Sequence, residues 1–317
     1  MLRKSVVALA VCAVVLVSVA PVPAQEPKVT IAMSGWTGFA PLTLAEKAGL
    51  FKKHGVDAGI KFIPQKDRHL AIASGDVACA ATTVETWIVW NANGVATRQV
   101  VQLDKSYGAD GMVVRKDVGK IADLRGKTIA ASAPGTAPYF TLAWFLKKNG
   151  LSVKDVKVVN LEPGPAAQAF IAGQNDAAMT YEPYLSSVRE KPEAGKIIAT
   201  TLDYPMIMDT FGCTPKFIQE QPKLVQAMVN GYFDALDMIK HEPKKSFEIM
   251  GAAVKQTGEQ FEKSQSYLRW QDREANKRFF AGDIQAFSKE AADLLLELGI
   301  IKTVPDTSAI IDTRFIR

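Results

Sequence analysis

The 317-residue chain is 48% hydrophobic and carries 38 Lys and Arg against 33 Asp and Glu, a formal net charge of +5. This positive charge is small and evenly spread, so it does not indicate a nucleic-acid-binding protein. Neither a P-loop nor a GxGxxG segment is present, and the three Cys and three His show no metal-ligand spacing.

The first 24 residues have the pattern of a secretory signal peptide. Arg3 and Lys4 precede an apolar run from Val6 to Ala20, and small residues at Val22-Pro23-Ala24 precede Gln25. We expect cleavage near Ala24 and export. The alternative is a retained anchor, although the run is short of the roughly 20 apolar residues that a membrane span needs.

The next eighty residues alternate short β-branched runs with amphipathic stretches. Strands are predicted over residues 29–33, 56–63, 77–80 and 99–103. Helices are predicted over residues 41–51, 68–73 and 84–90. This β-α-β rhythm favours a mostly parallel sheet with helices on both faces.

The same rhythm begins again near residue 111, which indicates a second unit of the same class. Its predicted strands are 111–114, 127–130, 156–159 and 176–180, and its predicted helices are 139–148 and 166–172. After residues 197–201 the pattern changes. From Pro222 onward the chain is largely helical, and an apolar stripe beginning at Leu224 predicts a core-facing helix.

Several segments resemble one protein family in order and spacing. Gly35-Trp36-Thr37-Gly38-Phe39-Ala40-Pro41-Leu42 leads into Gly49-Leu50-Phe51. Asp123-Leu124-Arg125-Gly126-Lys127 follows, and then Tyr181-Glu182-Pro183-Tyr184. Together these resemble the nitrate/taurine-type periplasmic substrate-binding proteins of ABC transporters, with similarity from about Val29 to Pro215.

The resemblance implies an α/β fold, the type II periplasmic-binding-protein clamshell, in which each lobe is a mostly parallel sheet flanked by helices. Lobe one is expected to comprise residues 25–109 and 204–317, with the C-terminal helices packed on it, and lobe two residues 110–203. The chain then crosses between lobes near 103–109 and 200–208. The resemblance further implies a small-molecule solute, a membrane permease as partner, no cofactor, no nucleic acid and a monomer in the periplasm.

Six clusters at strand ends, helix starts or crossings are candidates for contact with the ligand in the cleft between lobes. They contain Trp36 and Thr37; Thr82, Thr83 and Glu85; Tyr107 and Asp110; Gly135, Thr136 and Tyr139; Tyr181 and Glu182; and Asp209. Tyr181, Glu182 and Asp209 are candidates because of the resemblance. For the others, core packing of Trp36, helix capping and ordinary turns are the competing interpretations.

Carboxylates gathered around one cleft repel one another unless a cation balances them. Asp110 is the first candidate for binding a positive ligand group, and the first turn after Gly135 and Thr136 is the candidate for an anionic group. A zwitterion such as an aminosulfonate or an amino acid fits this set best. Nitrate or bicarbonate fits worse, because the six clusters contain neither Lys nor Arg.

An enzyme is the competing class. Thiamine-pyrimidine synthases share the fold that the resemblance implies, but the cysteine-rich segment expected of them is absent here. A pyrimidine-precursor binding protein or a sensor module stays open. Cys79 and Cys213 lie in apolar contexts, where a disulfide and two buried free thiols are both compatible with export.

Overall fold

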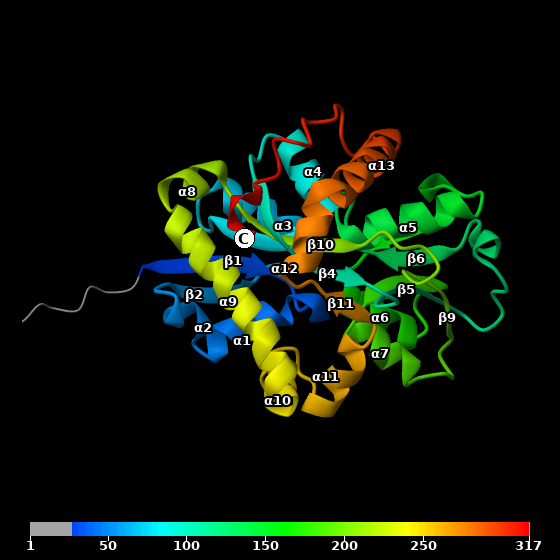
Figure 1. Cartoon of the computed structure of the whole chain (residues 1–317). Coiled ribbons are helices and arrows are strands. Elements are labelled where there is room, and N and C mark those ends of the chain that lie inside the picture. The colour runs from blue at the N-terminus through cyan, green and yellow to red at the C-terminus, as the bar shows by residue number, and fades with distance from the viewer. Residues whose placement is uncertain (1–26, 317) are drawn as a thin grey trace, which may run out of the picture.

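The computed structural model describes residues 27–316, so the predicted signal peptide lies outside the described residues. Two sheets are joined side by side, with helices on the faces of each (Figure 1). No helix within residues 27–316 has the length and apolar character that crossing a bilayer requires.

The first sheet takes its strands from both ends of the described chain, in the order β11-β4-β10-β3-β1-β2. Their bounds are β1 (Lys28–Met33), β2 (Asp57–Phe62), β3 (Cys79–Thr83), β4 (Arg98–Ser106), β10 (Met208–Cys213) and β11 (Leu268–Trp270). Ile31 and Met33 contribute to the core under α1 (Ala40–Lys47) and α9 (Pro222–His241). Ala32 packs on the opposite face with α3 (Gln65–Ala73) and α4 (Val84–Ala92). The alternation of side chains along a strand thus supplies both faces.

The second sheet is built from the middle of the chain, in the order β7-β6-β8-β5-β9. Its strands are β5 (Asp110–Val114), β6 (Thr128–Ala131), β7 (Lys157–Asn160), β8 (Ala177–Tyr181) and β9 (Lys196–Thr200). Helix α5 (Ala137–Lys148) covers one face, and α6 (Pro163–Ile171) and α7 (Tyr184–Arg189) cover the other. This arrangement confirms the α/β fold class with two helix-flanked sheets.

Both sheets are mixed, which corrects the expectation of mostly parallel sheets. Strand β1 runs parallel to β2 and β3, whereas β10 is antiparallel to β3 and β4. In the second sheet, β5 is antiparallel to β8 and β9. The reason is topological: β4 leads out of the first sheet and β10 leads back into it beside β4, so the two must run in opposite directions.

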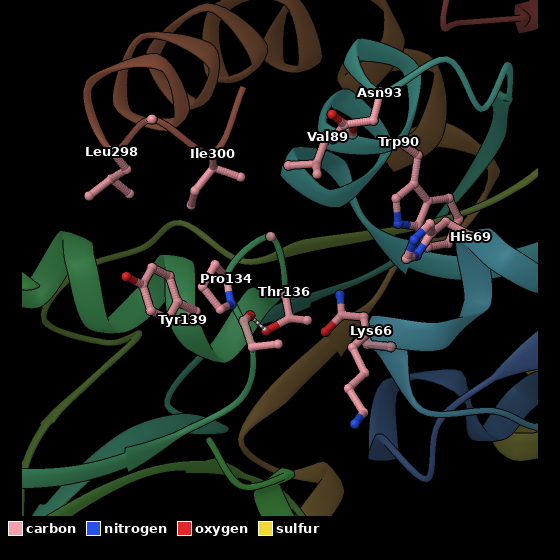
Figure 2. A pocket seen from close by; sticks show the side chains of 14 residues that line it. Lys66, His69, Val89, Trp90, Asn93, Pro134, Thr136, Tyr139, Leu298 and Ile300 are labelled. Carbon is pink, nitrogen blue, oxygen red and sulfur yellow. Dashed lines mark hydrogen bonds between the residues drawn. The ribbon is translucent and has the colours of Figure 1, made fainter. Parts of the chain in front are cut away.

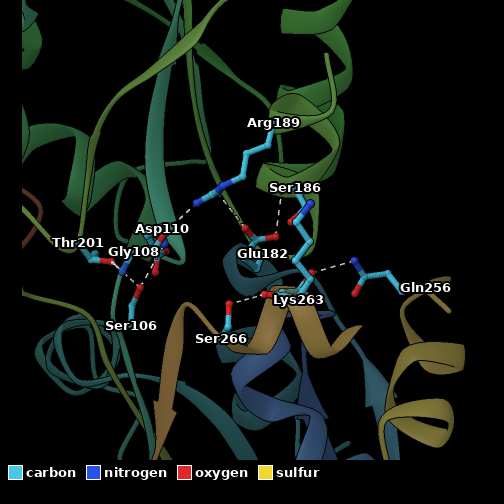
Figure 3. Close-up of polar contacts among 11 residues, drawn as sticks. Ser106, Gly108, Asp110, Glu182, Ser186, Arg189, Thr201, Gln256, Lys263 and Ser266 are labelled. Carbon is cyan, nitrogen blue, oxygen red and sulfur yellow. Dashed lines mark hydrogen bonds and ion pairs between the residues drawn. The ribbon is translucent and has the colours of Figure 1, made fainter. Parts of the chain in front are cut away.

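The two connections between the sheets lie side by side. Ser106 Oγ and Thr201 Oγ1 are 2.6 Å apart, and the Gly108 amide donates to Thr201 Oγ1 at 2.9 Å. Figure 3 shows this group next to Asp110. Any motion of one sheet against the other therefore bends both connections together.

Several element bounds differ from those predicted. The helix expected over 41–51 is divided into α1 and α2 (Leu50–Lys53) at Gly49, whose φ is 71°. Helix α3 begins at Gln65 rather than Arg68, and β3 extends to Thr83. The remaining helices are α8 (Pro215–Glu220), α10 (Pro243–Ala253), α11 (Gly258–Gln265), α12 (Arg273–Arg278) and α13 (Ile284–Glu297).

The C-terminal helices contact both halves of the molecule, rather than only the half formed by the first sheet. Helix α9 packs on α1 and α2, as expected. Helix α13 packs on α4, but its last residue, Glu297, forms an ion pair with Lys147 of α5. Figure 1 shows α13 beside α4 and above α5.

Cys79 and Cys213 form a disulfide, which answers the question that the sequence left open. They are opposite residues in the antiparallel pairing of β3 with β10, and both are fully buried. They are 134 positions apart in the sequence, and the chain between them includes the whole second sheet. The bond therefore fixes the first sheet at the place where the chain returns from the second.

Candidate functional site

A small cavity of about 20 Å³ lies where strand ends of the two sheets meet. The first sheet and its helices supply Trp36, Arg68, Thr83 and Asp209, and the second sheet supplies Asp110 and Tyr181, together with other wall residues. This space holds about one water molecule. Four of the residues predicted to contact the ligand therefore line one cavity between the sheets: Trp36, Asp110, Tyr181 and Asp209.

Trp36 forms an aromatic wall of the cavity. Its ring contacts that of Tyr181 edge to face, with centroids 5.3 Å apart, and its Nε1 donates to Asp104 Oδ1 at 3.2 Å. A Cβ at Gly38 would overlap both Asp104 and the Trp36 indole. Gly38 is thus required for the approach of Trp36 to Asp104.

Four carboxyl groups gather on one side of the cavity, and burial raises the pKa of each. The pKa of Asp110 rises to about 7 and that of Glu85 to about 8. Burial also raises the pKa values of Asp104 and Asp209, which are opposite residues in the β4–β10 pairing and hydrogen-bonded to each other. Two buried carboxyls in contact cannot both be ionised, so this pair shares a proton.

Three of these carboxyls have an oxygen with no hydrogen-bond partner within the described residues. They are Glu85 Oε2, Asp110 Oδ2 and Asp209 Oδ2. A buried acceptor without a partner costs about 1–3 kcal/mol, and more when it is charged. Unsatisfied oxygens at one cavity therefore indicate a site for a donor, and a cationic donor fits best.

Arg68 is the cation of the site, and it corrects the expectation that the cleft holds no Lys or Arg. It is 1% exposed, and its Nε and Nη1 donate to the carbonyls of Ile63 at 2.9 Å and Ala81 at 2.6 Å. Its Nη2 has no partner within the described residues. Burial lowers the pKa of Arg68 to about 10, so the side chain stays charged at neutral pH. An anionic ligand group is the natural partner for Nη2.

Gln65 and three threonines form the floor between the sheets. Gln65 Nε2 donates to Thr82 Oγ1 and Thr86 Oγ1, each at 2.9 Å, and Gln65 Oε1 accepts from the Ala137 amide at 3.2 Å. Thr83 donates to Glu85. The predicted ligand contacts Thr82, Thr83 and Glu85 therefore form hydrogen bonds with other protein groups. Of these three residues, only Thr83 lines the cavity.

The remaining predicted residues lie outside the inner cavity. Gly135, Thr136 and Tyr139 line a separate outer groove of about 560 Å³, shown in Figure 2, and the Thr136 hydroxyl donates to the Ala133 carbonyl at 2.7 Å. The first amide of α5 is taken by Gln65, so the predicted anion position is filled by the protein itself.

Tyr107, Glu182 and Thr37 do not line the cavity either. Tyr107 is 48% exposed and lies under Arg269, with 4.6 Å from the guanidinium to the ring centre. Glu182 is buried beside Arg189 at 3.4 Å and accepts from the Ser186 amide (Figure 3). Thr37 is buried, and its amide donates to the Glu182 carbonyl across the sheets at 3.3 Å.

Sequence reasoning missed Arg68, Gln65 and Asp104. Gln65, Arg68 and Ile72 are the buried residues of α3 and follow helical spacing, but the helix was predicted to begin only at Arg68. Asp104 directly follows the predicted strand 99–103, so its position at a strand end is a signal that could have selected it.

No group of three or more His, Cys, Asp or Glu within residues 27–316 is arranged to hold a metal ion.

Comparisons with known proteins agree with this architecture. A binding protein of Brucella abortus (strain 2308) is 25% identical over 261 residues, 80% of each chain. The taurine-binding periplasmic protein of Escherichia coli (strain K12) is 26% identical over 227 residues, 67% of this chain and 66% of that protein. Both are binding proteins, in agreement with the expectation of a non-enzymatic protein.

The fold is also that of solved binding proteins. The alkanesulfonate-binding protein SsuA from Xanthomonas axonopodis pv. citri has a TM-score of 0.75 at 18% identity, over 92% of this chain and 100% of that chain. The nitrate-binding protein NrtA from Synechocystis PCC 6803 has a TM-score of 0.73 at 16% identity, over 90% and 85%. At such identities the likeness shows the fold. The family profile described as NMT1/THI5 like matches residues 36–246, more than half of the chain, and this protein therefore belongs to the NMT1/THI5-like family.

Proposed function

We propose that this protein is the exported solute-binding component of an ABC importer, and that its solute is a small zwitterion carrying an ammonium or amidinium group. The supporting observation is the pair of unpartnered, buried oxygens on Asp110 and Asp209 opposite the unpartnered Nη2 of Arg68. A molecule with one positive and one negative end satisfies all three groups, and no side chain of residues 27–316 satisfies any of them.

The ligand is oriented by this charge pattern. Its cationic group lies against Asp110 and Asp209, and its anionic group lies on Arg68 rather than on the first turn of α5. The carbon atoms that join the two charged groups of the ligand lie against the rings of Trp36 and Tyr181, which contact each other. Taurine, which the Escherichia coli relative binds according to its name, has this charge pattern, and other aminosulfonates share it.

A purely anionic solute such as nitrate fits poorly. It would gain Arg68 but would face the carboxyls of Asp110 and Asp209 at close range. Juxtaposed like charges at a binding site cost several kcal/mol. The two carboxyls of Asp110 and Asp209 thus outnumber the one cation, Arg68. A ligand that carries a positive group balances the second carboxyl.

Delivery requires a second conformation. We place the lobes at residues 25–109 with 204–317 and at residues 110–203, with the hinge in the paired connections at Ser106 and Thr201. A cavity of about 20 Å³ is too small for taurine, so the solute enters while the lobes are apart. The permease then receives it from a monomeric carrier in the periplasm.

The test is titration calorimetry with matched solutes at pH 7.5. Taurine should bind, ethanesulfonate should bind at least tenfold more weakly because it lacks the amine, and nitrate should not bind. Amino acids and an aminopyrimidine belong in the panel, since a flat amidine-like ring also suits the carboxyls beside Trp36. Equal affinity for taurine and ethanesulfonate would contradict the zwitterion, and turnover of any solute would contradict a binding role.

A further inference from the structure

The outer groove and the inner cavity share one wall residue, Gln65. The inner cavity measures about 20 Å³ and the groove about 560 Å³. On the second sheet's side the walls are continuous, because Thr136 lines the groove and its neighbour Ala137 lines the cavity. Gln65 therefore lies at the boundary between the charged inner cavity and the much larger groove.

Gln65 is held across this boundary at both ends of its amide. Its two Nε2 hydrogens serve Thr82 and Thr86 on the first sheet's side, and its Oε1 serves the Ala137 amide on the other. The reversed amide would put hydrogens against the Ala137 N–H, so the contacts fix one orientation. Gln65 is 9% exposed, so its side chain is held in place between the cavity and the groove and is not a mobile surface group.

The groove beyond Gln65 suits an apolar substituent. Val89, Pro134, Leu298 and Ile300 supply aliphatic walls, and the rings of Trp90 and Tyr139 add aromatic ones. Lys66, His69 and Asn93 line the polar remainder of the groove. Figure 2 shows Leu298 and Ile300 facing the groove from one side and Pro134 and Tyr139 from another. The volume is within the range of small-molecule sites.

We propose that the ligand site has two compartments and that Gln65 determines whether a ligand can occupy both. This inference rests on the proposed function and adds a specificity-determining residue to it. With Gln65 in place, the site accepts only the small zwitterion. When the Gln65 side chain is shortened, a cyclohexyl-sized group on the ligand nitrogen passes into the groove while the charged groups stay on Asp110, Asp209 and Arg68.

The experiment compares taurine with N-cyclohexyltaurine, which has the same charges and an added ring. Titration calorimetry on the wild type should show taurine binding at least tenfold more tightly. Gln65→Ala should shift the ratio of the two affinities at least tenfold toward N-cyclohexyltaurine. Gln226→Ala, a matched substitution on α9, should leave the ratio unchanged. An unchanged ratio in Gln65→Ala overturns the proposal.

A second readout needs no ligand and separates this inference from the proposed function. Acrylamide quenching of Trp36 is measured as the difference between each protein and its Trp36→Phe counterpart. Gln65→Ala should raise the quenching constant at least twofold, because the quencher reaches the inner cavity from the groove. If no protein binds either taurine compound, the proposed function fails, while unchanged quenching refutes the role of Gln65 between the cavity and the groove.

Discussion

Replacing Asp110 by Asn should move ligand affinity and protein stability in opposite directions. Asp110 is 4% exposed, lines the cavity and has an unpartnered Oδ2. Asn keeps the shape but removes the charge. The ligand loses its partner, whereas the folded protein loses a buried carboxylate that it holds at a cost.

The loss of affinity follows from burial. Removing one partner of a buried charge pair costs about 2–5 kcal/mol, or roughly 30- to 5000-fold in Kd. Titration calorimetry with taurine at pH 8 measures it. Asp117→Asn, an exposed carboxyl on the second sheet's side, is the control and should change Kd less than twofold.

The stability effect has a definite pH window. Because burial raises the pKa of Asp110 to about 7, its contribution to stability is full below the ordinary pKa near 4 and is lost as pH rises to about 7. Two pH units separate pH 5 from that value, which corresponds to about 2–3 kcal/mol. The Asn variant should therefore gain about this much relative to wild type between pH 5 and pH 8.

Urea unfolding of the unliganded proteins at pH 5 and pH 8 measures this gain. A variant that is no more stable relative to wild type at pH 8 than at pH 5 would refute the assignment of a strained carboxylate. Retained affinity would refute its role as the cation partner. The two results are independent, so each half of the reasoning can fail alone.

Three further outcomes follow from the same geometry. Arg68→Met should weaken taurine at least thirtyfold by calorimetry, because Nη2 is the only cationic donor among the described residues lining the cavity. Replacing Cys79 and Cys213 by Ala should lower the free energy of unfolding by about 2–4 kcal/mol in urea while leaving Kd unchanged, since the disulfide lies in the core. Tyr107→Ala should change Kd less than twofold, because that ring faces solvent under Arg269.

The sequence was sufficient for the fold class, because β-α-β periodicity and the spacing of the family segments are local signals. Trp36 and Asp110, which line the cavity, were selected because strand ends and crossings can be recognised and strand ends meet at sheet edges. Tyr181 and Asp209, which also line it, were selected from the family resemblance. Strand direction was not recoverable from the same signals. A parallel and an antiparallel buried strand have the same apolar pattern, so the sequence could not predict that both sheets are mixed.

The errors at the site have a common cause, which is the direction of side chains. Tyr107 lies at a crossing and Glu182 directly follows β8, but the first faces solvent and the second faces Arg189. Arg68 was assigned to an ordinary helix because its partners, the carbonyls of Ile63 and Ala81, are backbone atoms that carry no residue-specific signal. A boundary error of three residues at α3 then removed Gln65 from consideration as well.

The imbalance between carboxyls and Arg68 also bears on how solute binding is coupled to protons. Asp104, Asp110, Asp209 and Glu85 are buried close to one another, and Asp110 and Asp209 line the cavity with Arg68. The unliganded site holds protons near neutral pH, because burial raises the pKa of every one of these carboxyls. A cationic group placed among them favours the ionised forms and lowers those pKa values. Binding must then release protons, and affinity must rise between pH 5.5 and pH 8 for an ammonium whose own charge is constant over that range. Calorimetry in two buffers of different ionisation enthalpy measures the released protons directly. A solute that binds without releasing protons at pH 6.5 would have its cationic group elsewhere, and the acidic cluster would then be a feature of the folded protein alone.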